Sequence, residues 1–289
     1  MRPTNMKLAL ALFSLLLISG CSMDRMLVRA STPMIEGGVE ALNHETDLEL
    51  AEDSIPANLN MLRGMISIDP ENAQLHTFAA QAYYGLSYGF NEDNRPERAS
   101  DFYLRGRQHG LTALEINGGK DLMNSPIADF EKQLSHFGRD DVAAMFWTAS
   151  NWAKWIDMHR DDVEAIAQLV RATALMQRVI ELDDTFYYGG AHMYFGVYYG
   201  SRAPLLGGNF VKSRQHFDRA REITNSKLLI TDLLQAQYLA RQQQDQQDFH
   251  DLLTAIVNAP DDLMPELALQ NQIAKRKAAI LLKKESEWF

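Results

Sequence analysis

The residues best able to do metal or acid–base chemistry are scattered along the chain. The eight histidines are spread almost evenly, at His44, His76, His109, His136, His159, His192, His216 and His250. No two are four residues apart, the spacing that lets two imidazoles bind one zinc ion from a single helical face. We therefore expect solvated or core histidines and no metal site; a site assembled from distant histidines is the alternative.

Acidic residues are plentiful, and several occur as neighbours. Asp140 with Asp141 and Asp161 with Asp162 fall where helices are expected to begin. Carboxylates there complement the positive end of the helix dipole. We interpret these pairs as helix caps in preference to an acid–base dyad.

Patterns for nucleophilic catalysis and phosphate binding are also missing. No serine lies in a Gly-x-Ser-x-Gly elbow, which excludes the α/β-hydrolase arrangement. Gly207 and Gly208 precede Lys212 and Ser213, but a phosphate loop places its glycine directly before the lysine and follows a strand. The glycines therefore predict a turn, and the sequence predicts no catalytic residues, no cofactor and no enzyme.

Aromatic residues are concentrated in two stretches. One holds Phe186, Tyr187, Tyr188, Tyr194, Phe195, Tyr198 and Tyr199, and the other holds Trp147, Trp152 and Trp155. Core packing is the simpler interpretation, above all for Phe195 and Trp152. Consecutive tyrosines on a helix cannot all face one core, however, and a buried tyrosine hydroxyl needs a partner or water. The candidates to line a channel for an apolar or amphipathic molecule are Tyr84, Tyr88, Trp147, Trp152, Tyr198 and Tyr199.

A short pattern occurs twice: an aromatic residue, Gly, an aliphatic residue, any residue, Tyr, Gly. It spans Tyr84 to Gly89 and again Phe195 to Gly200. Residues four apart share a helix face, so Gly85 with Gly89, and Gly196 with Gly200, predict stripes where another helix approaches closely. Glycine costs about 1 kcal/mol inside a helix relative to alanine, which favours a packing reason for each pair.

The elements around these residues are expected to be helices throughout. Apolar spacing, caps and breakers predict helices over about 47–68, 72–88, 96–117, 126–137, 140–156, 161–180, 186–200, 210–225, 228–241, 249–257 and 266–282. The turn residues Asp183, Asn225 and Pro260 recur near the period of tetratricopeptide hairpins, about 34 residues. We predict an all-α fold of degenerate tetratricopeptide-like hairpins over residues 41–289, forming one α-solenoid with a central groove or channel.

The first residues have the pattern of an export signal. Arg2 and Lys7 precede an apolar run over 8–17, and Ile18-Ser19-Gly20-Cys21 resembles a bacterial lipobox. We predict a cleaved signal peptide over 1–20, lipid on Cys21, and a tether over 21–40. An ordinary signal peptide followed by a chance cysteine is the alternative. Cys21 is the only cysteine, so no intramolecular disulfide can form.

The residue after the cysteine indicates the target membrane, and the net charge limits the class of partner. In the bacterial sorting pattern that this start resembles, Ser22 after the cysteine points to the outer membrane. The formal net charge of −10 becomes −12 once Arg2 and Lys7 are removed. Such a chain is unsuited to nucleic acid, whose affinity comes largely from basic side chains.

The chain resembles the TRAP transporter T components, the TatT-like family of tetratricopeptide-type periplasmic lipoproteins. Four blocks carry the resemblance, in the same order: Ile55-Pro56-Ala57-Asn58-Leu59 up to Asp69-Pro70; Pro96-Glu97-Arg98-Ala99 with Tyr103, Arg105, Gly106 and Arg107; Tyr188-Gly189-Gly190-Ala191-His192 through Tyr198-Tyr199-Gly200 to 205–209; and Pro265-Glu266 with Asn271 and the helix over 274–282. The resemblance implies an all-helical lipoprotein that works with the periplasmic solute-binding protein of a TRAP transporter. It also implies homo-oligomers, trimers included, with a channel through each protomer.

The main hypothesis is therefore a lipid-anchored accessory component that binds the solute-binding protein and passes on a hydrophobic small ligand. A scaffold lipoprotein of an outer-membrane assembly complex is the alternative, and the aromatic clusters favour the first. A helical-toroid hydrolase is the weakest reading, because no convergent carboxylates can be identified.

Overall fold

The computed structural model describes residues 23–289, and every regular element in that range is helical. The elements are α2 (Thr32–Asn43), α3 (Leu48–Ile68), α4 (Ala73–Leu86), η1 (Ser87–Asn91), α5 (Pro96–Ile116), α6 (Ile127–Leu134), η2 (Arg139–Asp141), α7 (Val142–Asp157), α8 (Val163–Ala167), α9 (Leu169–Leu182), α10 (Phe186–Gly200), η3 (Pro204–Leu206), α11 (Phe210–Thr224), α12 (Ile230–Leu234), η4 (Gln235–Ala240), α13 (Arg241–Gln243), α14 (Gln246–Asn258), η5 (Pro265–Leu267), α15 (Ala268–Leu282) and α16 (Glu285–Trp288). The predicted all-α fold is confirmed.

Helix starts follow the capping rules that the sequence suggested. The Asp47 carboxylate accepts hydrogen bonds from two backbone N–H groups at the start of α3, and Asp162 does the same for α8. The side-chain oxygens of Asn72 and Asn209 cap α4 and α11. Each cap satisfies backbone donors that a helix start leaves without a partner, so these residues fix where the helices begin.

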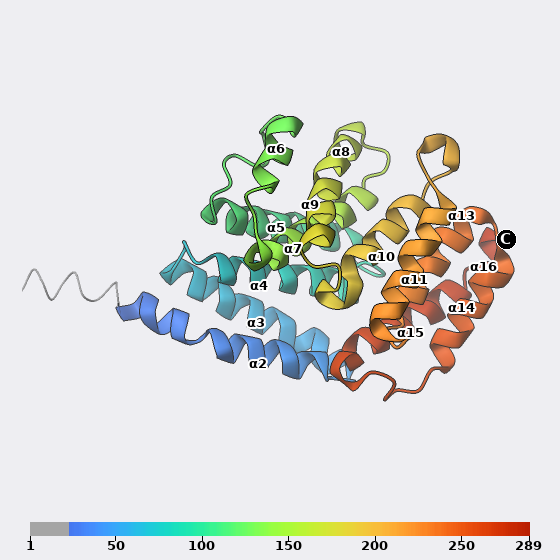
Figure 1. Ribbon diagram of the computed structural model, residues 1–289. Coiled ribbons are helices and arrows are strands. Elements are labelled where there is room, and N and C mark those ends of the chain that lie inside the picture. The colour runs from blue at the N-terminus through green and yellow to red at the C-terminus, as the bar shows by residue number, and fades with distance from the viewer. Residues whose placement is uncertain (1–22) are drawn as a thin grey trace, which may run out of the picture.

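The helices pack as neighbouring pairs around a shared interior. α4 packs extensively on α5, α5 on α7, and α10 on α11. In Figure 1 the N-terminal helices α2 to α5 lie on one side of α10, and α11 to α16 lie on the other. Because α15 also contacts α2 and α3, the two ends of the chain meet and the arrangement closes on itself.

Three irregular turns interrupt these helices beside the interior. η1 and η4 are π-helical, a form that occurs mostly as single turns and often at functional sites. In α10, Tyr187 (φ 44°), Tyr188 (φ 58°) and Gly189 (φ 77°) form a left-handed turn. Positive φ is unusual for bulky residues, and such strain is typical of functional sites.

The segment expected to be a tether is partly built into the fold. Residues 23–30 are helical, and α2 follows almost at once. Ile35 of α2 is buried, and Arg29 Nε donates to the buried carboxylate of Asp69 at 2.7 Å. The tether prediction over 21–40 is therefore corrected, because the apolar spacing of Ile35, Val39 and Leu42 gives α2 a packing face. Cys21 and the signal peptide lie outside the described residues.

Within residues 23–289, no helix combines the length and the apolar character that crossing a membrane requires.

Candidate functional site

A cavity of about 680 Å³ lies inside the closed arrangement of helices. Its walls come mainly from α2, α3, α4, α7, α10 and α15, together with η1 and η4, and a few side chains of α8, α9, α12, η3 and η5 complete them. Most lining side chains are aliphatic or aromatic, and the aromatic ones are Phe78, Tyr84, Tyr88, Phe90, Phe146, Trp147, Tyr187, Tyr194, Tyr198 and Tyr238. The size and the apolar lining are typical of sites for small molecules, about 300–1,000 Å³.

Four of the six channel candidates reach this cavity. Tyr84, Tyr88, Trp147 and Tyr198 are lining residues, whereas Trp152 and Tyr199 are not. Trp152 is fully buried, and its Nε1 donates to Gln168 Oε1 at 2.9 Å. The channel assignment is therefore corrected for these two: Trp152 packs in the core, and Tyr199 stacks on His216.

The aromatic rings of the wall contact one another across elements. Tyr84 stacks on Tyr88 with ring centroids 5.8 Å apart, and it meets Trp147 at 5.5 Å. Trp147 meets Tyr187 edge-on at 4.7 Å. The left-handed turn of α10 thus carries a tyrosine ring onto the tryptophan of α7. Offset and edge-to-face pairs of this kind are favourable, about 0.5–1.5 kcal/mol each, so they stabilise the wall.

The predicted glycine stripes lie in two different environments. A Cβ on Gly196 would stand 2.7–2.8 Å from the Phe217 ring, and one on Gly200 would stand 2.6 Å from Ser213 Oγ. A Cβ on Gly89 would stand 3.1 Å from Ile273 Cδ1. Gly85 is the exception, because it lines the cavity and a Cβ there would meet nothing within 4 Å. The prediction of a close helix contact is corrected at Gly85.

A further glycine pair, which the sequence analysis did not single out, allows the closest helix approach. A Cβ on Gly106 would lie 2.2 Å from Asn151 Oδ1, and one on Gly110 would lie 2.1 Å from Thr148 Oγ1. The two glycines stand four apart in α5 and face α7. The i, i+4 spacing in α5 was the signal that could have revealed them.

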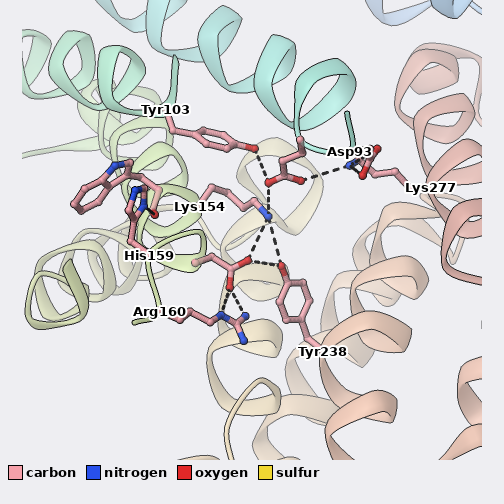
Figure 2. A network of polar contacts seen from close by, with 10 residues as sticks. Asp93, Tyr103, Lys154, His159, Arg160, Tyr238 and Lys277 are labelled. Atoms are coloured by element: carbon pink, nitrogen blue, oxygen red, sulfur yellow. Dashed lines mark hydrogen bonds and ion pairs between the residues drawn. The ribbon is translucent and has the colours of Figure 1, made fainter. Parts of the chain in front are cut away.

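Figure 2 shows a network of charged side chains, of which Lys154, Asp157 and Arg160 line the cavity. Lys154 of α7 is at the centre of the network, with Nζ 2.6 Å from Glu92 Oε1 and 3.5 Å from Asp157 Oδ2. Tyr238 of η4 donates to Asp157 at 2.7 Å, and Tyr103 of α5 donates to Glu92 at 3.0 Å. The network therefore joins α5, α7, η4 and the end of η1.

Two more cations complete the network. Lys277 Nζ of α15 lies 3.4 Å from Glu92 and 3.0 Å from Asp93, and Arg160 donates to Asp157. Burial alone would lower the pKa of Lys154, but the Glu92 carboxylate raises that pKa well above its usual range. Burial opposes ionisation of Asp157, yet Lys154 and Arg160 hold its pKa below the usual value. The two carboxylates thus favour the charged form of Lys154.

Four histidines form two pairs between helices. His76 and His109 place their Nδ1 atoms 3.0 Å apart between α4 and α5, and His192 and His216 do so between α10 and α11. Burial lowers the pKa of all four, to about 4 for His109 and for His216. Among residues 23–289, no three His, Cys, Asp or Glu side chains converge as metal ligands.

The fold and the cavity define an all-helical protein whose main internal feature is an apolar, aromatic-walled space. Residues 44–289 match the family model described as TRAP transporter T-component, which is nearly the whole chain. The chain therefore belongs to the TRAP transporter T-component family, as its sequence blocks indicated. A search of curated proteins gave no match.

Proposed function

We propose that the protein is a lipid-anchored periplasmic accessory component of a TRAP transporter that carries an apolar or amphipathic ligand in its cavity. It exchanges this ligand with the solute-binding protein of the transporter. The aromatic-walled cavity of about 680 Å³ carries the proposal, because its size and apolar lining are those of small-molecule sites. Membership of the T-component family supplies the link to a TRAP system.

Exposure of the lining residues supports passage through the protomer. Met34 of α2 and Met61 of α3 line the cavity and are 79% and 52% exposed. Ile166 of α8 and Leu206 of η3 line it too and are 45% and 73% exposed. The two groups belong to elements far apart in the sequence, and α2 and α8 lie at opposite sides of the fold in Figure 1. A ligand then has one route in and another route out.

The anchor is tested at the lipobox. Cys21→Ala should abolish acylation and release the protein from the outer-membrane fraction, or leave it unprocessed. Fractionation followed by intact-mass measurement reads out both effects. Normal processing together with full membrane retention would contradict the lipoprotein assignment.

The cavity is tested by filling it. Gly85→Phe places a ring in the cavity from a position where a Cβ meets no neighbour, so the fold should tolerate the change. Gly64→Phe in α3 is the matched control, because Gly64 is exposed, has no neighbour within 4 Å and does not line the cavity.

Native mass spectrometry is the measurement for both variants, alone and mixed with the cognate solute-binding protein. It also reports the homo-oligomer, for which the proposal includes a trimer. Gly85→Phe should lose co-purifying apolar ligand and keep partner binding, while Gly64→Phe should keep both. Partner binding with equal ligand content in the two variants would refute ligand passage and favour the scaffold alternative.

A further inference from the structure

A second, polar cavity of about 480 Å³ adjoins the apolar one. The two share four lining residues, Asp157, Arg160, Ser201 and Tyr238. The other residues of the polar cavity are Gln237, Arg241, Gln242 and Gln244, and three of these four are exposed. The polar cavity is therefore a surface recess whose inner wall is also the wall of the apolar cavity.

Positive charge dominates the lining of the two cavities. Four cations line them, Lys154, Arg160, Arg202 and Arg241, against the single carboxylate of Asp157. That carboxylate is already paired with Lys154 and Arg160. Even with Glu92 counted as the partner of Lys154, two positive charges remain. The excess contrasts with the whole chain, whose formal net charge is −10.

Two of these arginines have no carboxylate within ion-pair distance among residues 23–289. Arg202 lies over the Tyr198 ring at 4.0 Å and donates to the Tyr198 carbonyl, while Arg241 lies over the Trp288 ring at 3.8 Å. Stacking orients a guanidinium and leaves other N–H groups able to donate in its plane. Burial lowers the pKa of Arg241, and the charge of Arg160 lowers it further, so these two cations lie near each other.

Arg160 already pairs with Asp157, so Arg241 supplies the unpaired positive charge of the recess, and an anion beside Arg241 would also be attracted by the nearby Arg160. The polar cavity also holds the amide groups of three glutamines, which donate hydrogen bonds without adding charge. The recess thus provides donors and positive charge, and the adjoining space provides apolar surface.

We propose that the polar cavity binds the anionic head group of an amphipathic molecule whose single apolar chain lies in the aromatic cavity. This inference rests on the proposed function, since it names the class of ligand and its orientation. A head group at the surface keeps part of its hydration, which full burial of a charge would remove at high cost. A carboxylate and a phosphate monoester share the required chemistry.

The test uses the chain without residues 1–21, which retains every residue of the described fold. Binding is measured by isothermal titration calorimetry, below micelle-forming concentrations, for four probes with one C12 chain: dodecanoate, dodecyl phosphate, dodecanol and dodecyltrimethylammonium. C8 and C16 members of each series vary the tail. The two anions separate a carboxylate head group from a phosphate head group.

Arg241→Gln is the test variant, because Arg241 is exposed and makes no ion pair that the fold requires among residues 23–289. Arg139→Gln is the matched control, since Arg139 is exposed and lines neither cavity. At least one anion should bind tenfold or more tightly than dodecanol, and the ammonium probe should bind most weakly. Arg241→Gln should weaken the anion five- to tenfold and leave dodecanol unchanged, and Arg139→Gln should change neither.

The contrary outcomes distinguish failure of the head-group site from failure of the proposed ligand carriage. Dodecanol binding as tightly as both anions, or anion binding that Arg241→Gln leaves unchanged, would overturn the head-group site and leave ligand carriage standing. Failure of every probe of every chain length to bind would overturn both.

Discussion

Replacing two equivalent glycines by alanine gives a direct test of the packing around the cavity. Gly85 and Gly196 occupy the same position of the repeated pattern; Gly196 lies inside α10, and Gly85 lies where α4 continues directly into η1. Alanine is favoured over glycine there by about 1 kcal/mol through helix propensity alone. That gain is common to both substitutions, so the difference between the two variants measures the surroundings of the new methyl group.

The structure predicts both the sign and the size of the difference in unfolding free energy between the two variants. The methyl group of Gly85→Ala would project into the cavity with no atom within 4 Å, so this variant should be more stable by about 1 kcal/mol. The methyl group of Gly196→Ala would lie under 3 Å from three carbons of the Phe217 ring, which is itself fully buried. Overpacking of this kind costs about 1–3 kcal/mol. The stability of Gly85→Ala should therefore exceed that of Gly196→Ala by about 1–3 kcal/mol.

Equilibrium urea unfolding followed by circular dichroism gives both free energies. In thermal unfolding, the same gap corresponds to a melting temperature difference of about 2–4 °C per kcal/mol. Equal stabilities for the two variants would show that the Gly196 face tolerates a side chain as readily as the cavity face. The close α10–α11 contact would then be wrong.

Two further predictions concern titration and charge. The pKa values of His109 and His216 are lowered to about 4. Below about pH 6.5 these histidines therefore bind fewer protons in the folded chain than in the unfolded chain. The free energy of unfolding should fall as the pH drops from 6.5 toward 4. His216→Gln should flatten that dependence in unfolding measured at pH 7 and pH 5; an unchanged slope would contradict the pairing. Lys154→Met should destabilise the fold by about 3–5 kcal/mol by urea unfolding, because Glu92 and Asp157 lose a buried partner. A loss below about 1 kcal/mol would show that water reaches the site.

Helix positions followed from the sequence because their causes are local. Apolar spacing and cap residues such as Asp47 and Asn72 act within a few residues, and the helices begin where those residues stand. Ile35, Val39 and Leu42 of α2 carry the same local signal, which the tether prediction over 21–40 did not take into account. The left-handed turn at Tyr187 and Tyr188 had no local signal, since tyrosine rarely adopts positive φ.

The cavity wall could be predicted in part, for a geometric reason. Trp147 and Trp152 stand five residues apart, which turns them about 140° from each other around α7. Only one can face the cavity, and Trp147 does. The same argument separates Tyr198 from Tyr199, about 100° apart on α10. The aromatic segments could be identified from the sequence. Which ring of each segment reaches the cavity depends on the face that α7 and α10 turn inward, and tertiary packing determines that face.

Lys154 stands out in the sequence, but its ion-pair partners could not be predicted from the sequence. It is the only charged side chain between Val142 and Ile156, in a helix otherwise built for a core. Asp157 is a local partner, three positions along α7, but the other two are distant: Glu92, just after η1, and Tyr238 of η4 lie 62 and 84 positions away. Because the pairing joins distant elements around the cavity, the same ion pairs that keep Lys154 charged also fix the distance between the walls. The cavity is therefore bordered by paired buried charge, and the recess beside it holds one arginine, Arg241, that has no carboxylate partner among residues 23–289.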